Sequence, residues 1–271
     1  MDYKPLTTII FDMDGTLANT EEIHRQAFNE AFTEFELPIN WGPQEYARLL
    51  SISGGRQRIY QYLKNSEFII RKDKRKFARE IHIRKSEIYR EKLNAGHIEL
   101  RRGVFRLIQE ARKNHVRIGI ATSSSLSNIK TLINTTLGEQ GLDYFDSIVS
   151  CDLISDQKPS PAIYQYALAE LGTNPWNCIA IEDTTNGNRA ALAAGIKTII
   201  TTHEFTIDSD FSGASLVLDD MGEPGHDFNV IMGDSYGHKY LNLELMKNIL
   251  LNEPTESDES SWLLSYATYT K

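Results

Sequence analysis

The sequence has few cysteines and no long apolar segment. Its two cysteines, Cys151 and Cys178, cannot build a disulfide framework, and neither belongs to a CxxC pair. The seven histidines show no HExxH or comparable zinc spacing. No apolar run approaches the ~18 residues that a membrane span needs, and the N-terminal stretch 6–11 is too short for a signal peptide. We therefore expect a soluble, cytoplasmic protein without a membrane partner.

An overall excess of basic residues is also lacking. The net charge of −8 argues against nucleic acid as the main partner. With 271 residues, 41% of them apolar and 24% charged, the chain suits one large or two modest globular domains. Within this acidic chain, residues 71–92 hold 10 basic and 4 acidic residues. Such a segment is either a solvated helix face, which composition alone favours, or a trap for an anionic substrate.

Short apolar segments alternate with helical patterns along most of the chain. Six segments rich in β-branched residues predict buried strands: 6–11, 116–121, 147–150, 178–181, 197–201 and 215–218. Helical patterns separate the later ones, at 126–136, 161–171 and 186–194. This alternation predicts an α/β fold with right-handed crossovers and a parallel sheet that is covered on both faces.

A long helical stretch interrupts this rhythm after the first strand. Four helices are expected there, at 20–35, 43–50, 56–63 and 73–93, and a helix at 103–114 then begins the sheet domain again. We therefore assign residues 1–16 and 101–228 to an α/β core and residues 17–100 to a helical insert. Residues 229–271 would form a last helix, at 240–251, and a loose acidic tail.

Two aspartates stand at the carboxyl end of the first predicted strand. Asp12 and Asp14 are two residues apart, so both carboxylates can converge on one spot. In open α/β sheets this edge is where ligands bind. Like charges so close need a cation or a shared proton, and Gly15 permits a sharp turn after them. The alternative is a polar turn in which an aspartate caps the next helix.

Three later segments end predicted strands and would meet the same edge. Separately they are compatible with a helix cap, a surface lysine and a capping turn. Together they offer hydroxyl and backbone donors, one lysine and an acid pair for a phosphate and a magnesium ion. The residues concerned are Thr122, Ser123, Ser124, Lys158, Glu182 and Asp183.

This ordered set resembles the motifs of the haloacid dehalogenase superfamily of phosphotransferases, over residues 8–227. The resemblance implies that Asp12 is the nucleophile, which becomes an aspartyl phosphate, and that Asp14 is the general acid and base. It further implies that Mg²⁺ is held by Asp12, the main-chain carbonyl of Asp14 and Asp183, with Glu182 nearby. Thr122, the backbone N–H of Ser123, and Lys158 match the phosphate cradle, which Ser124 adjoins.

An acid at the position of Asp14 separates this chain from the dehalogenases and from the transport ATPases of the superfamily. The insert matches the helical cap of the β-phosphoglucomutase-like subfamily, so the resemblance implies a Rossmann-like core with a cap inserted after the first strand. Thr20 and His24 match hinge positions that couple cap closure to the acid/base, although His24 could simply lie on a helix face.

The CbbY-like branch of sugar bisphosphate phosphatases is closer still. Residues 49–56 resemble its substrate loop, with Gly54, Gly55 and Arg56, and residues 82–89 resemble its basic helix, with Arg84 and Lys85. Residues 213–217 also resemble that branch. Asn19 is a departure, because close relatives tend to carry glutamate there.

The sequence therefore predicts a monomeric, Mg²⁺-dependent phosphatase of a small phosphorylated sugar, such as xylulose or ribulose bisphosphate. Two alternatives remain. One is a phosphoglucomutase-type mutase, which uses the same residues but returns the phosphoryl group to the sugar. The other is a receiver-type signalling module that is phosphorylated on one aspartate without turnover; the long insert argues against it, because a receiver needs an exposed aspartate.

Overall fold

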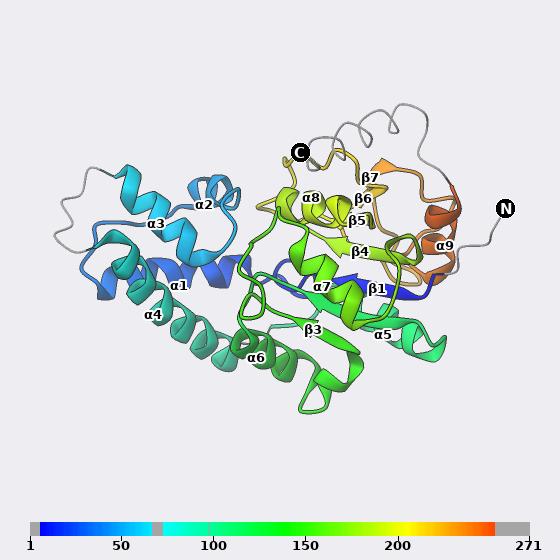
Figure 1. Cartoon of the computed structure of the whole chain (residues 1–271), viewed down its shortest axis with the longest axis horizontal. Coiled ribbons are helices and arrows are strands. Elements are labelled where there is room, and N and C mark those ends of the chain that lie inside the picture. The colour runs from blue at the N-terminus through cyan, green and yellow to red at the C-terminus, as the bar shows by residue number, and fades with distance from the viewer. Residues whose placement is uncertain (1–5, 67–72, 97, 253–271) are drawn as a thin grey trace.

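A seven-stranded sheet forms the centre of the part of the chain that the computed structural model describes, residues 6–66, 73–96 and 98–252 (Figure 1). The strand order is β3-β2-β1-β4-β5-β6-β7. The strands are β1 (Thr8–Phe11), β2 (Arg117–Ala121), β3 (Ser147–Val149), β4 (Cys178–Glu182), β5 (Lys197–Thr201), β6 (Leu216–Leu218) and β7 (Val230–Gly233). Strands β1 to β6 are parallel, whereas β7 runs antiparallel to β6. The predicted α/β fold with a parallel sheet is confirmed.

The six strands predicted from the sequence are all present, with ends shifted by at most two residues. Strand β7 is the element that the sequence pattern misses. It pairs with β6 alone, and Val230, Ile231 and Met232 are exposed. All four residues of this short strand are exposed, so its sequence lacks both the alternation of apolar and polar residues of a half-buried strand and the length of a buried one.

Helices connect the strands from β1 to β5 as crossovers: α5 (Val104–Lys113), α6 (Leu126–Leu137), α7 (Ala162–Glu170) and α8 (Thr185–Ala193). Helix α9 (Leu243–Leu251) follows the last strand, and η1 (Gly141–Tyr144) and η2 (Pro175–Asn177) are single 3₁₀ turns. Helix α9 begins at Leu243 and not at the predicted residue 240, because Asn242 caps it by accepting a hydrogen bond from the backbone N–H of Leu245. The predicted acidic tail beyond Asn252 lies outside the described residues.

The predicted insert consists of α1 (Glu21–Glu34), α2 (Pro43–Leu49), α3 (Gly55–Asn65) and α4 (Lys74–Ala95). Figure 1 shows these helices gathered beyond the end at which β1 leads into α1. An aromatic cluster centred on the buried Trp41 packs them together, with Phe28 and Phe32 at ring distances of 4.9 and 4.7 Å. We call α1–α4 the cap. The exact division between cap and core, at residues 17 and 101, stays a prediction.

The chain enters and leaves the cap at one place. Ala18 and Leu100 form an antiparallel bridge, and the backbone N–H of Arg101 donates to the carbonyl oxygen of Leu17 at 2.8 Å. The two connections between core and cap therefore run side by side. Among the described helices, none is long and apolar enough to cross a membrane.

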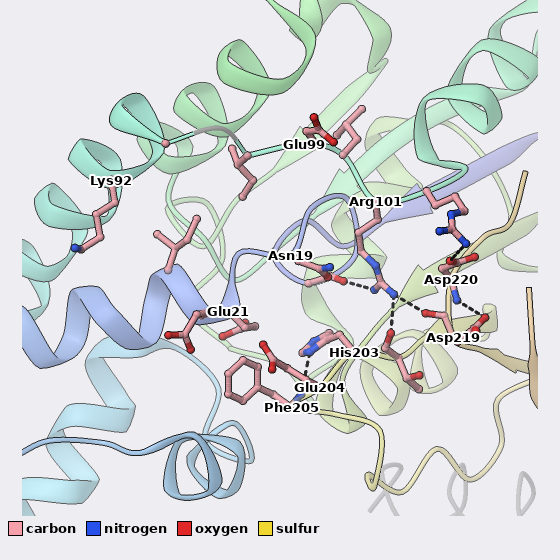
Figure 2. Close-up of a pocket in the computed structure, with 18 residues that line it drawn as sticks. Asn19, Glu21, Lys92, Glu99, Arg101, His203, Glu204, Phe205, Asp219 and Asp220 are labelled. Carbon is pink, nitrogen blue, oxygen red and sulfur yellow. Dashed lines mark hydrogen bonds and ion pairs between the residues drawn. The ribbon is translucent and has the colours of Figure 1, made fainter. Parts of the chain in front are cut away.

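Arg101 fastens this junction to the sheet. Its buried guanidinium donates to four backbone carbonyl oxygens (Figure 2). One lies in the turn after β1, two lie at the end of β5, and one lies just after β6. These acceptors are Gly15, Thr201, Thr202 and Asp219. Burial lowers the pKa of Arg101 from its ordinary value, although Asp183 and Asp220 oppose this. The side chain thus acts as a buried clamp between loops that are distant in sequence.

Replacing Arg101 by methionine is expected to lower the free energy of unfolding by about 3 kcal/mol or more, because buried carbonyl oxygens lose their donors. Urea unfolding measures this change. Arg102→Met is the matched control: that side chain is 52% exposed and has one ion pair, with Asp220, so about 0.5 kcal/mol is expected. Equal losses of unfolding free energy in the two variants would contradict the role of Arg101 as a buried clamp.

Candidate active site

Lys158 connects the carboxyl ends of three neighbouring strands. Its Nζ lies 2.6 Å from Oδ1 of Asp12, which follows β1, and 2.5 Å from Oε1 of Glu182, which ends β4. It also donates to the carbonyl oxygen of Ala121, the last residue of β2, at 2.9 Å. All three charged side chains are buried. One positive charge is therefore shared between two carboxylates in a site with little water.

The electrostatics of this cluster are unbalanced. Burial raises the pKa of Asp12 well above its usual range, and Glu182 and Asp183 add to this, while Lys158 opposes it. Burial would lower the pKa of Lys158, but the attraction of Asp12 and Glu182 raises it instead. Burial also raises the pKa of Asp183. Three acids face one lysine, so the cluster favours a further cation.

The same acids form a suitable metal site. Oxygen atoms of Asp12, Glu182 and Asp183 lie within 4.8 Å of one another. Carboxylate oxygens are the ligands that Mg²⁺ prefers. Both carboxylate oxygens of Glu182 already have hydrogen-bond donors. Oε1 accepts from Lys158 and from the hydroxyl of Tyr164, the latter at 2.7 Å, and Oε2 accepts from the backbone N–H of Asp183. The donor set therefore fits a magnesium ion held chiefly by the two aspartates.

Two glycines leave the space that these carboxylates fill. A Cβ atom at Gly15, where φ is +84°, would lie 2.3 Å from Oδ2 of Asp183. A Cβ atom at Gly187, in the first turn of α8, would lie 1.9 Å from the carboxylate of Glu182. Such distances are impossible for a real side chain, so both acids depend on glycines close to them in space.

Asp14 is held by four donors from both parts of the protein. Oδ1 accepts from the hydroxyl of Thr20 at 2.7 Å, from that of Tyr89 at 3.0 Å, and from Nε2 of His24 at 3.0 Å. Oδ2 accepts from the hydroxyl of Ser124. Burial would raise the pKa of Asp14, but His24 and the hydroxyl donors together hold it well below its usual range. Asp14 is therefore a carboxylate in this arrangement.

The ring nitrogen of His24 that faces away from Asp14 contacts a buried lysine of the cap. Nζ of Lys85 lies 2.6 Å from Nδ1 of His24, and the imidazole stacks on the ring of Tyr89 at 3.9 Å. When Lys85 is charged it donates to Nδ1, so the proton of His24 is on Nε2 and points to Asp14. Burial lowers the pKa of Lys85 to about 7, although Asp14 and Glu21 oppose the shift.

A cleft of about 840 Å³ lies between the core and the cap. The core side contributes most of the residues that the motifs predicted: Asp12, Asp14, Thr122, Ser123, Ser124 and Lys158. The cap side contributes a predominantly basic wall: His24, Gly54, Gly55, Arg56, Arg58, Arg79, His82 and Lys85. Thr20 is buried beside Asp14 and does not line the cleft, so its observed contact is with the acid/base candidate.

The positive potential of this wall is visible at His82. Its pKa is lowered to about 3, first by burial and then by the charges of Lys85 and Arg56. Among the described residues, no carboxylate pairs with Arg56, which stands in the first turn of α3. The cleft therefore has a free cation at its cap end.

Arg84 does not belong to this wall. Its guanidinium pairs with three glutamates on the outer surface of the cap, Glu34, Glu87 and Glu91, at 2.6 to 3.2 Å. Helix α4 thus has two basic faces, one on the outer surface and one that lines the cleft. Binding of an anionic substrate by the second face stays a prediction. The expectation that Arg84 binds substrate is corrected: the helix period turns it away from Lys85.

The motif after β2 lies at the N-terminal end of α6, where a helix can bind an anion. The buried Oγ1 of Thr122 accepts from the backbone N–H of Ser124 at 3.2 Å. Ser125 caps α6 through its side chain, so Ser123 stands just before the N-terminal end of that helix. Thr122, Ser123 and Lys158 line the same cleft as Asp12, and their role as a phosphate cradle stays a prediction.

Several contacts of the site could not be predicted from motifs. Tyr89 and Tyr164 reach Asp14 and Glu182 from helices far away in sequence. Asn186, from the acid-pair segment, donates to the carbonyl oxygen of Ser51 at 2.8 Å and to the hydroxyl of Ser53 at 3.0 Å, which joins the core to the loop before α3. In the sequence, nothing distinguishes these side chains from ordinary core or surface residues. Their contacts become visible only in the folded structure.

A second cavity, of about 710 Å³, lies on the other side of the junction between core and cap (Figure 2). Asn19 lines this cavity and not the cleft. Glu21 lines both, and its Oε2 accepts a hydrogen bond from the hydroxyl of Tyr46 at 2.6 Å. Residue 19 therefore lies outside the cleft, whereas the acid two residues further along the chain lines it.

Comparisons with known proteins agree with this geometry. The family model of haloacid dehalogenase-like hydrolases matches residues 9–201. CbbY of Cereibacter sphaeroides is 38% identical over 221 residues, which cover 81% of this chain and 94% of that protein. CbbY of Cupriavidus necator is also 38% identical, over 81% of this chain and 87% of that protein. A crystal structure of a CbbY variant from Rhodobacter sphaeroides, in complex with xylulose-1,5-bisphosphate, has a TM-score of 0.75 at 37% identity, covering 79% of this chain and 94% of that one.

The chain belongs to the haloacid dehalogenase-like hydrolases. It is a phosphatase of that family, similar to CbbY. The predicted family and enzyme class are confirmed, and a receiver module without turnover does not agree with them. The cap over the aspartates also argues against a receiver, because Asp12 is buried.

Lys85 gives stability a pH dependence that can be measured. Its pKa is about 7 in the folded protein and about 10.4 in an unfolded chain. Between these values the unfolded state binds more protons, so stability rises with pH. Urea unfolding of the wild type and of Lys85→Met should show the wild type gaining about 2–3 kcal/mol relative to the variant between pH 7 and pH 9.

The exposed Lys76 of the same helix provides the control for this measurement. Lys76→Met should change stability by the same small amount at both pH values. A wild type that loses stability relative to Lys85→Met as the pH rises would contradict the assignment.

Proposed function

We propose that this protein is a Mg²⁺-dependent phosphatase that hydrolyses a small phosphorylated sugar, and that its preferred substrates are sugar bisphosphates such as xylulose 1,5-bisphosphate. The observation that carries the proposal is the position of Lys158 between Asp12 and Glu182, directly below a cleft with basic walls. The complex of a CbbY variant with xylulose-1,5-bisphosphate supports the choice of substrate.

Asp12 is the proposed nucleophile. Lys158 binds its Oδ1, and no donor from the described residues binds Oδ2, so that oxygen has free lone pairs for attack on phosphorus. Lys158 opposes the rise in the pKa of this buried carboxyl group, and it lines the cleft in which the phosphoryl oxygens would bind. Thr122 and Ser123 hold the phosphate for attack in line with the leaving oxygen. The product is an aspartyl phosphate on Asp12.

Mg²⁺ would be held by Asp12, Asp183 and the main-chain carbonyl of Asp14, with Glu182 as a charged neighbour. When bound, it neutralises charge on the transferring phosphoryl group. The raised pKa values of Asp12 and Asp183 fit this assignment, because a buried acid in excess of its lysine partner needs a second cation.

Asp14 is the proposed acid and base. The four donors around it stabilise the carboxylate, which is the form that takes a proton from water in the second half of the reaction. A phosphate dianion in the cleft would raise the pKa of Asp14 again by like-charge repulsion. Arrival of the substrate therefore favours the protonated form that the leaving oxygen needs in the first half.

Phosphate release from a panel of phosphorylated sugars, with Mg²⁺ and with a chelator, tests the proposed function. Asp12→Asn is the control for contaminating phosphatases and should reduce turnover to background, since it removes the attacking carboxylate. Conversion of a hexose 1-phosphate to its 6-phosphate without phosphate release would instead identify the mutase, which would use the same residues. Turnover that is independent of a divalent cation would contradict the metal assignment.

The acid role of Asp14 predicts a dependence on the leaving group. Asp14→Asn should cost on the order of 10²–10⁴ in rate on a sugar phosphate, whose leaving oxygen must be protonated. The loss in the phosphoryl-transfer step should be much smaller on an activated aryl phosphate, which leaves without a proton. Burst kinetics separate this step from hydrolysis of the intermediate, and equal losses on both substrates would contradict the acid role.

The free guanidinium of Arg56 predicts selection of a second phosphate. Gly54 and Gly55 place backbone N–H groups beside it at the beginning of α3. A charge-assisted contact is worth about 1.5–3 kcal/mol, or roughly ten- to a hundredfold in affinity. Arg56→Ala should therefore lower kcat/KM on a sugar bisphosphate by about that factor and hardly affect a small monophosphate.

Arg84→Ala provides the matched control for this measurement, because it removes an arginine of the same cap whose partners are glutamates. It should leave kcat/KM on both substrates almost unchanged. The same loss for Arg56→Ala on the monophosphate and the bisphosphate would contradict the second-phosphate site while leaving the phosphatase intact.

A further inference from the structure

His203 makes direct contact with one of the proposed metal ligands. It follows the last residues of β5, and its Nε2 lies 2.9 Å from Oδ2 of Asp183. Both side chains are buried, with exposed fractions of 7% and 1%. On the other side of the carboxylate, the hydroxyl of Thr16 donates to Oδ1 at 3.1 Å. Each oxygen of Asp183 is therefore bound by a different donor from a different strand end.

The second ring nitrogen of His203 settles which atom carries the proton. The backbone N–H of Phe205 donates to Nδ1 at 3.3 Å, so Nδ1 accepts and the proton is on Nε2. Two further hydrogen bonds fix the turn: the backbone N–H of His203 donates to the hydroxyl of Thr206, and the carbonyl oxygen of His203 accepts from the backbone N–H of Thr206. The imidazole is thus held in a fixed orientation, with Nε2 directed at Asp183.

The packing around this pair leaves the side chain of Asp183 few alternative orientations. Gly15 has no side chain, and a Cβ atom there would lie 2.9 Å from Nε2 of His203 as well as against Asp183. His203 and Gly15 line the second cavity, whereas Asp183 does not (Figure 2). The imidazole therefore stands between that cavity and the carboxylate.

We propose that His203 is a positioning residue that holds Asp183 in the orientation needed to bind the divalent cation of the phosphatase. This inference rests on the magnesium dependence proposed above. His203 is not one of the residues whose oxygen or nitrogen atoms cluster in the metal site, which are Asp12, Glu182 and Asp183. It acts through the hydrogen bond to Oδ2, which fixes the direction of the lone pairs that remain. Loss of such an outer hydrogen bond typically costs about 10- to 100-fold in metal affinity.

Binding of Mn²⁺, followed by the electron paramagnetic resonance signal of the free ion, tests the proposal without an activity assay. Competition with Mg²⁺ shows that both ions share one site. His203→Phe keeps a planar ring next to Phe205 but removes the donor, and it should weaken Mn²⁺ binding by about 10- to 100-fold. His203→Gln restores an N–H near the position of Nε2 and should bind within about threefold of the wild type. His226→Phe, at an exposed histidine, is the control and should not change binding.

The outcomes separate this inference from the proposed function. A wild type that binds no Mn²⁺ overturns both the metal dependence and the role of His203. A wild type that binds, with a His203→Phe variant of the same affinity, overturns only the role of His203. A His203→Gln variant as weak as His203→Phe, with an unchanged melting temperature without metal, also overturns it, because a donor alone would then not suffice.

A second measurement uses the unmodified protein, in case His203→Phe does not fold. Long-range ¹H–¹⁵N correlation spectra of the histidine side chains distinguish the two neutral tautomers. His203 should show the Nε2–H form, and its signals should shift when Mg²⁺ is added. The Nδ1–H form, or signals that are insensitive to Mg²⁺, would overturn the proposal.

Discussion

The ion pair of Lys158 with Asp12 and Glu182 is the interaction on which the rest of the site depends. It brings together the ends of β1, β2 and β4, which are far apart in sequence, around a single buried ammonium group. Removing a charged partner from such a cluster leaves an uncompensated buried charge, which is strongly destabilising. With three acids around one lysine, the cluster carries an excess of buried negative charge in the free protein, and this excess is the physical reason for the divalent cation proposed above.

The second constraint is that the core and the cap must be in contact for all the hydrogen bonds to Asp14 to form. Ser124 reaches it from the core, whereas Tyr89 reaches it from α4 of the cap, and Lys85 supports His24 from the same helix. The proposed acid and base chemistry thus depends on contacts between cap and core, whereas the hydrogen-bond partner of the proposed nucleophile Asp12 comes from the core. A basic cap wall with a free Arg56 gives an anionic substrate the means to favour these contacts.

Much of this could be predicted from the sequence, for physical reasons that differ from part to part. The strands and most of the motif residues were predictable because buried parallel strands are apolar runs and because their carboxyl ends meet at one edge. Strand β7 was not, since it is only four residues long and all four are exposed, so no alternating pattern marks it. Arg84 and Lys85 are neighbours in a basic run, and only the rotation of α4 against α1 decides which of them enters the cleft. His203 carries no motif, and its contact with Asp183 exists only because β4 and β5 are adjacent in the sheet.

The bridge between Ala18 and Leu100 has a consequence for how such a protein can change over time. Because the two connections lie side by side, the chain leaves the core and returns to it at almost the same point. For the core, the whole cap is therefore equivalent to a short loop. Closing that loop costs almost the same conformational entropy whatever is built beyond it. A cap of another size or another lining can therefore replace this one without disturbing the pairing of β1 with β2 and β4. The strands that position Asp12 and Asp183 are thus independent of what the cap contains, whereas a replacement cap would have to supply new partners for Asp14 in place of His24 and Tyr89.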